Sequence, residues 1–163
     1  MARLSGHKAF PTGRRMICLV VFVTVALFFS GCLRTNDSGA VSVNPRGWKP
    51  NDAKVIKYAN TDTLSSRSIK IFMIHESSMR SICDSLPLLV TTLSPDSLEI
   101  TEPVTFHLCF RDNGIAGSEF IECGQTYRSG AILQEGTYTF SVRHNNPSSV
   151  KGIRAVGIEI SAQ

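Results

Sequence analysis

A histidine and a cysteine stand two residues apart in one strand-like segment, at His107 and Cys109. Alternate side chains of a strand share a face, so the pair could begin a metal site, with Cys123 or His75 as further ligands. A structural zinc site needs four ligands placed together, and this spacing matches no known zinc pattern. We therefore interpret His107 and Cys109 as half-exposed sheet residues and expect no metal and no cofactor.

Three carboxylates, Asp96, Glu99 and Glu102, gather around an expected turn. They could perform acid–base chemistry or bind calcium, but a calcium site needs six or more oxygen ligands. A solvated loop is the simpler interpretation. The chain also lacks the GxSxG, HExxH, Walker-type and CxxC motifs, so we expect no catalytic residues and no enzymatic activity.

The most specific chemistry lies at Cys32. Two arginines at 14–15 precede an apolar run at 16–29, and two small residues then lead to the cysteine. A positive flank, a short apolar stretch and a small-residue exit are typical of a secretory signal. The run is shorter than the ~20 residues of a membrane-spanning helix. The alternatives are an uncleaved anchor and an unmodified buried cysteine.

The tetrapeptide Phe29-Ser30-Gly31-Cys32 resembles a bacterial lipobox. This resemblance implies cleavage between Gly31 and Cys32 and acylation of the Cys32 thiol. Four of the seventeen basic residues lie in 1–31 and none of the thirteen acidic ones do, so residues 32–163 carry no net formal charge. The basic character of the whole chain therefore gives no support for a nucleic-acid partner.

Residues 33–45 are small, polar and rich in turn formers. They predict a flexible tether, so we divide the chain into a removed signal peptide (1–31), a lipidated cysteine with its tether (32–46) and one domain (47–163). Leu33 takes the place where aspartate retains many bacterial lipoproteins at the inner membrane. We therefore expect anchoring in the outer membrane, facing the periplasm.

Strand-like alternation of apolar and polar residues recurs through the rest of the chain. It is clearest at 104–110, 138–142 and 156–160, and further strands are expected at 55–58 and 86–93. Residues 69–74 are apolar on both faces, which predicts a central strand. Turn signals separate these runs, and no long helical stripe follows Cys32. The pattern predicts an all-β fold with a single antiparallel β-sandwich domain.

Three cysteines remain after the signal and the lipidated position, namely Cys83, Cys109 and Cys123. Cys109 and Cys123 would close a short loop, but Cys83 could pair with either, so we expect one disulfide or none.

Trp48 is the only tryptophan. If exposed, it could stack on a sugar or dock a partner, but we favour a buried plug at one end of the sandwich. His144 continues the inward face of its strand and is interpreted as a structural residue.

Several segments resemble one known family, the gliding motility lipoproteins of the GldH type. Gly47-Trp48-Lys49-Pro50-Asn51-Asp52 follows the tether, and 54–58, 62–63 and 69–74 take the places of a strand, a linker and a two-sided strand. The strongest similarity is at the C-terminus, in GTYTFSVRH (136–144) and VKGIRAVGIEI (150–160). There Gly152, Ile153, Val156, Gly157, Ile158 and Ile160 occupy the family's positions.

This resemblance implies a non-catalytic envelope lipoprotein, a structural or accessory component associated with gliding motility or secretion machinery. Its expected partners are the membrane, through the acyl chains, and other envelope proteins. The alternative hypothesis is a lipid-anchored sandwich that binds glycan or peptide on a loop surface near Trp48.

Overall fold

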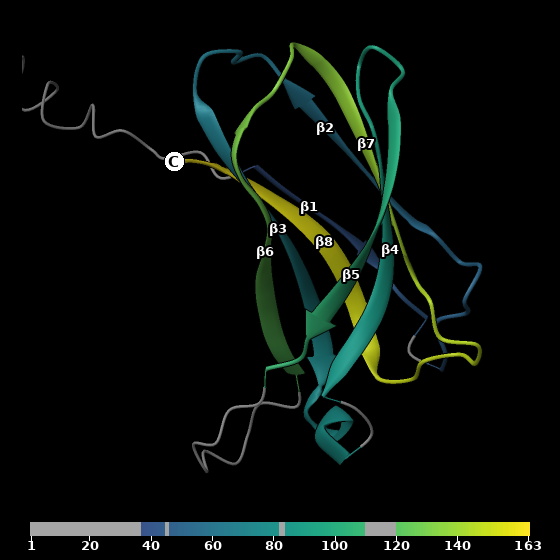
Figure 1. The fold of residues 1–163 in the computed structure, drawn as a ribbon. Coiled ribbons are helices and arrows are strands. Elements are labelled where there is room, and N and C mark those ends of the chain that lie inside the picture. The colour runs from purple at the N-terminus through teal and green to yellow at the C-terminus, as the bar shows by residue number, and fades with distance from the viewer. Residues whose placement is uncertain (1–36, 45, 82–83, 110–119) are drawn as a thin grey trace, which may run out of the picture. The chain divides into compact units, whose positions relative to one another are not determined.

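The computed structural model describes residues 37–44, 46–81, 84–109 and 120–163 (Figure 1). Within these ranges the chain forms eight strands and one short 3₁₀ helix. They are β1 (Asp37–Ser42), β2 (Lys54–Asn60), β3 (Ser66–Glu76), η1 (Ser77–Ser81), β4 (Ser85–Leu93), β5 (Glu99–His107), β6 (Phe120–Ile132), β7 (Gly136–His144) and β8 (Ile153–Ala162).

The strands form two four-stranded sheets, in the orders β1-β8-β3-β6 and β2-β7-β4-β5. All their pairings are antiparallel. The apolar residues of both sheets form one core, which includes Met73, Leu86, Phe106, Phe140 and Val156. The expected all-β antiparallel sandwich is therefore confirmed.

The strands expected from the sequence fall in β2, β3, β4, β5, β7 and β8, but no strand was expected at β6. In β7, Tyr138, Phe140 and Val142 are buried, and in β8 Val156, Ile158 and Ile160 are buried. The two-sided run at 69–74 falls in β3, which pairs with both β6 and β8 and is central as expected. One face of β3 is fully buried and the other is half-buried.

The expected tether at 32–46 is wrong in part, because residues 37–42 form β1. This strand pairs with β8, from Asp37 opposite Ile160 to Ser42 opposite Ala155. Its sequence, DSGAVS, has a single large apolar side chain at Val41, so local alternation does not reveal it. The folded domain thus begins by Asp37 rather than at Gly47, because β8 supplies hydrogen-bond partners that are remote in sequence.

The two ends of the sandwich differ. Trp48, η1 and the start of β4 lie at one end, which we call the closed end (Figure 1). At the other, which we call the open end, the connections 61–65, 94–98 and 133–135 meet, as the pairings of Asn60 with Gly136 and of Ser66 with Ile132 require. Because Asp37 pairs with Ile160, the chain enters β1 at the open end.

The predicted signal run, Gly31 and Cys32 lie outside the described residues, as does Phe110 of the predicted strand at 104–110. Within the described ranges, no helix has the length and apolar composition needed to cross a membrane.

Candidate functional site

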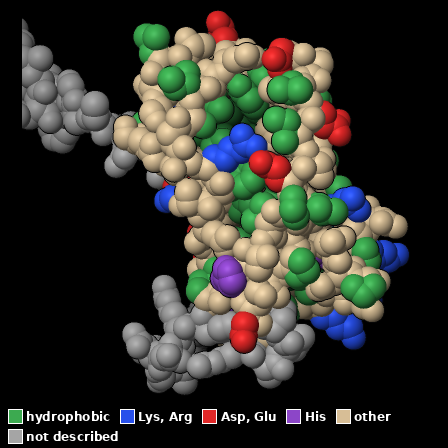
Figure 2. Space-filling model, in the orientation of Figure 1, with side chains coloured by type: hydrophobic (Ala, Val, Ile, Leu, Met, Phe, Trp, Pro, Cys, Tyr) green, Lys and Arg blue, Asp and Glu red, His purple; other side chains and the backbone are tan. Residues whose placement is uncertain are grey.

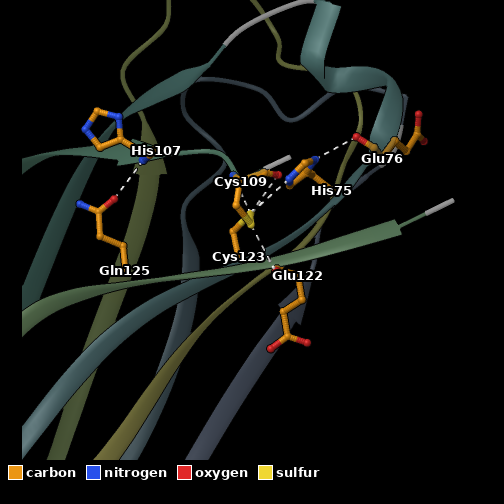
Figure 3. Close-up of a disulfide and its surroundings, with 7 residues drawn as sticks. All are labelled: His75, Glu76, His107, Cys109, Glu122, Cys123 and Gln125. Atoms are coloured by element: carbon orange, nitrogen blue, oxygen red, sulfur yellow. Dashed lines mark hydrogen bonds between the residues drawn. A yellow bond between two sulfur atoms is a disulfide. The ribbon is translucent and has the colours of Figure 1, made fainter. Parts of the chain in front are cut away.

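A disulfide joins Cys109, just after β5, to Cys123 in β6 (Figure 3). Of the pairings left open by the sequence, this is the one that forms; Cys83 lies outside the described residues. The backbone N–H of Cys109 also approaches the Cys123 sulfur, at 2.8 Å. The bond covalently links edge strands of the two sheets at the closed end.

His75 lies beside this disulfide and is fully buried. Its Nδ1 donates to the backbone oxygen of Glu76 at 2.8 Å, which leaves Nε2 facing the Cys123 sulfur at 3.4 Å (Figure 3). The backbone contact fixes the orientation of the ring.

The ligand atoms of His75, Cys109 and Cys123 lie within 4.8 Å of one another. Cys109 and Cys123 are joined in a disulfide, and metals bind thiolates rather than disulfide sulfurs. Neither sulfur is therefore a metal ligand in this state. His107 is not part of this cluster. Its side chain is exposed, and its backbone N–H donates to Gln125 (Figure 3). The structure thus brings three of the four candidate ligands together, but as a covalent Cys109–Cys123 link between the sheets with His75 packed beside it.

Trp48 is completely buried at the closed end. Its indole N–H donates to the Asp52 backbone oxygen at 2.6 Å, and its ring meets that of His144 edge-on, with centroids 5.0 Å apart. His144 Nε2 donates to the Trp48 oxygen, and the N–H of Asn146 donates to Nδ1. Both expectations, a plug and a structural histidine, are confirmed, and Trp48 offers no stacking surface.

The three carboxylates near the 94–98 turn do not form one site. Asp96 accepts hydrogen bonds from the Ser94 hydroxyl and then the Leu98 backbone, and these lower the pKa of its carboxyl. Glu102 instead reaches across to β6, where hydrogen bonds from Tyr127 and then Arg128 lower its pKa. The solvated-loop interpretation fits Asp96, whereas Glu99 is an exposed residue that begins β5 and Glu102 has a separate structural contact.

The gap between the edge strands β5 and β6 is crossed at three levels. The disulfide lies at the closed end. Next, the side-chain amide of Gln125 makes two hydrogen bonds to the backbone of β5: it accepts from the His107 N–H at 2.9 Å and donates to the Thr105 oxygen at 3.0 Å. Nearest the open end, Glu102 meets Tyr127 and Arg128. These links hold the edges of the two sheets together from the closed end to about Glu102.

Beyond the last link the sheets leave an apolar cavity of about 240 Å³. Its lining includes Ile69, Leu98, Ile100, Ile132 and Phe140. Figure 2 shows hydrophobic side chains gathered in and around this hollow, with basic and acidic side chains meeting within it. Small-molecule pockets usually measure ~300–1,000 Å³, so this cavity suits one or two side chains better than a large ligand.

Sequence reasoning did not find this cavity. Leu98 is 56% exposed and Ile132 is 69% exposed, although both are large and apolar. The sequence signal that could have indicated the cavity was the presence of large apolar residues inside or beside expected turns. Only the pairing of distant strands shows that they come together at one opening.

No protein-family model matches the chain, and no curated protein matches it either. The solved structures to which its fold is similar include dimeric latent PorU from Porphyromonas gingivalis, at 9% identity and a TM-score of 0.37. That similarity covers 78% of this chain and 12% of PorU, so the chain spans only a small part of PorU.

Two further structures are similar at the same level. The Yersinia pseudotuberculosis-derived mitogen has 8% identity and a TM-score of 0.33, over 80% of this chain and 88% of the mitogen. The infectious bursal disease virus Gx strain structure has 13% identity and a TM-score of 0.30, over 80% of this chain and 30% of that one.

Proposed function

We propose that the protein is a lipid-anchored envelope lipoprotein of the GldH type, a non-catalytic component that contacts other envelope proteins in gliding or secretion machinery. The observation that carries the proposal is the order of residues 14–32, a positive flank, a short apolar run and a small-residue exit to Cys32. Two acyl chains on Cys32 would give stable attachment, where one chain gives only marginal binding.

The short distance in sequence between Cys32 and β1 supports this proposal. Five residue-to-residue steps separate Cys32 from Asp37, and a fully extended chain of that length spans about 18 Å. A domain anchored at Cys32 would therefore be held close to the membrane surface. The open end, where β1 begins, would be the part of the domain attached directly to the anchor.

The anchor is tested by Cys32→Ser in the producing bacterium, followed by separation of membranes in high salt. We expect the wild-type protein in the membrane pellet and the variant in the soluble fraction. Cys83→Ser is the matched control, because it removes one thiol without touching the lipobox. A Cys32→Ser protein that still pellets would contradict the proposal.

The partner assignment needs a separate test. Tagged wild-type protein is purified from detergent-solubilised membranes, and the co-purifying proteins are identified. We expect components of gliding or secretion machinery, at lower yield with Cys32→Ser. Recovery of glycans alone would contradict the GldH-type role.

A second candidate function, a lipid-anchored binding module, is favoured by the apolar cavity between β5 and β6. The burial of Trp48 counts against the form of this hypothesis in which the tryptophan stacks on a sugar. The peptide-binding form is compatible with the GldH-type role, since binding a peptide of another envelope protein is one way to contact it.

A further inference from the structure

We infer that the cavity at the open end is a docking site for a short peptide segment of a partner protein, with apolar side chains flanked by lysine or arginine. This inference deepens the proposed function, because it rests on a role in protein contact and names the chemistry of the partner.

The apolar part of the segment follows from the exposed residues at the cavity. Leu98 and Ile132 stand at its opening, and Ile100 lines it while remaining 39% exposed. Leu64, in a neighbouring connection at the same end, is 89% exposed. At the closed end, by contrast, Trp48 is completely covered. Val55 and Phe120 are also exposed and lie toward the closed end, but the other five of the seven exposed large apolar residues in the described part of the chain lie at or near the open end, as expected for an interaction surface there.

The cationic part follows from the charges around the opening. Asp96 lines the cavity and Glu135 follows the lining residue Gln134, whereas Glu99, between the lining residues Leu98 and Ile100, lies on the other face of β5. Among the described residues, no lysine or arginine is within ion-pair distance of Asp96 or Glu135. Arg128 also lines the cavity, but its charge is matched by Glu102. The opening therefore carries excess negative charge, which attracts cations.

The same charges argue against a lipid as the occupant. Fatty acids and anionic phospholipids carry negative head groups, which these carboxylates would repel. A cationic peptide has the complementary charge and can place an apolar side chain in a cavity of this size.

The mode of binding follows from the edge of β5. Gln125 occupies the outward-facing Thr105 oxygen and His107 N–H. In an antiparallel strand every second residue faces the same edge, so Pro103 takes the next position, where it has no N–H to donate. A long added strand is therefore blocked here. The segment would bind by inserting side chains rather than by extending the sheet.

The test measures the binding of two dye-labelled acetylated pentapeptides, KLFLK and ELFLE, by fluorescence anisotropy at low salt. The protein is the full chain as isolated from the bacterium, in phosphatidylcholine nanodiscs if acylated and in buffer if not. We expect KLFLK to bind at least about tenfold more tightly than ELFLE, because two exposed charge contacts of this kind together amount to about one factor of ten. A failed anchor leaves this measurement intact, so the two proposals fail separately.

Two variants assign the effect to the open end. Asp96→Asn with Glu135→Gln should reduce the preference for KLFLK to less than about threefold. The control, Asp84→Asn with Glu122→Gln, removes two carboxylates near the closed end and should leave the preference unchanged. Leu98→Ser should weaken the binding of both peptides, because it removes an apolar side chain that lines the cavity.

Several results would overturn the inference. They are equal binding of the two peptides, a preference for ELFLE, no binding of KLFLK at millimolar concentration, or equal loss of preference in both double variants. Displacement of KLFLK by dodecanoate at equal concentration would identify a lipid site instead and would also overturn it.

Discussion

Individual buried residues at the closed end set the stability of the domain, and Trp48 is the largest of them. Replacing it with alanine removes a completely buried ring, and we expect the free energy of unfolding to fall by ~3–5 kcal/mol. Trp48→Phe keeps an aromatic ring but loses the hydrogen bond to the Asp52 oxygen, so a loss of ~1–2 kcal/mol is expected. Urea unfolding followed by circular dichroism measures both. A Trp48→Ala protein within 1 kcal/mol of wild type would show that Trp48 is not a core residue.

The disulfide between Cys109 and Cys123 gives a second prediction at this scale. The cysteines are 14 residues apart, and a loop of about this length contributes ~3 kcal/mol in the chain-entropy account. In a Cys83→Ser background, which prevents thiol exchange, Cys109→Ala with Cys123→Ala should lower the free energy of unfolding by that amount. Dithiothreitol should destabilise the parent and leave the double variant unchanged. A parent insensitive to dithiothreitol would contradict the assignment.

Asp62 gives the prediction for pH. Hydrogen bonds from the Ser65 side chain and backbone and from the Leu64 N–H lower the pKa of its carboxyl from 3.8 to about 2. The stabilisation from this carboxylate is therefore complete above about pH 3.8 and is lost as the pH falls through about 2. Asp62→Asn should flatten the dependence of unfolding free energy on pH between 4 and 2. An Asp62 carboxyl whose NMR titration midpoint lies near 3.8 would contradict this.

Single residues differed in how well the sequence predicted their roles. Trp48 and His144 were predictable as structural residues because a lone tryptophan and a histidine on an inward strand face are usually buried groups with hydrogen-bond partners. The choice of Cys123 rather than Cys83 as the partner of Cys109 was not predictable. It depends on the approach of β5 to β6, two edge strands that belong to different sheets and are not paired with each other.

At the scale of elements, the pairing of β1 with β8 depends on the absence of a side chain at Gly157. A Cβ there would lie 2.3 Å from the Phe72 ring and 2.5 Å from the Gly39 backbone oxygen. The backbone oxygen belongs to β1 and cannot rotate away, so Gly157→Ala should lower the free energy of unfolding by ~1–3 kcal/mol.

Gly124→Ala is the matched control for this prediction. Gly124 lies in β6 of the same sheet, and a Cβ there would meet nothing within 4 Å. We expect its free energy of unfolding to stay within ~0.5 kcal/mol of wild type. Hydrogen exchange should show β1 amides losing protection in Gly157→Ala alone. Equal effects of the two alanines would refute close packing of β1 on β8.

Elements with strong local alternation were predictable, whereas β1 and β6 were not predicted. β7 and β8 place three large apolar residues each at every second position, so their period is visible in the sequence alone. β1 has only Val41 as a large apolar residue, and it forms a strand because it pairs with β8, which lies more than a hundred residues later in the chain. The cavity was missed for the same reason, since its walls come from strands that meet only in the folded domain.

At the scale of the whole molecule, the sandwich has one end closed by Trp48 and one end that opens into an apolar cavity. The chain enters β1 at the open end, so an anchor at Cys32 would be attached to the same end of the domain as the cavity, although β1 and β6 are the opposite edges of their sheet. A partner bound in the cavity would then be held near the membrane surface, which fits a component that works by contact rather than by catalysis.

The acylation of Cys32 is the central claim, and the intact mass of the natural protein tests it most directly. We predict a species that begins at Cys32 and carries fatty acyl chains on that residue, with a mass that falls to the bare polypeptide after chemical deacylation. A protein that retains residues 1–31, or one whose Cys32 carries no acyl chain, would contradict the account.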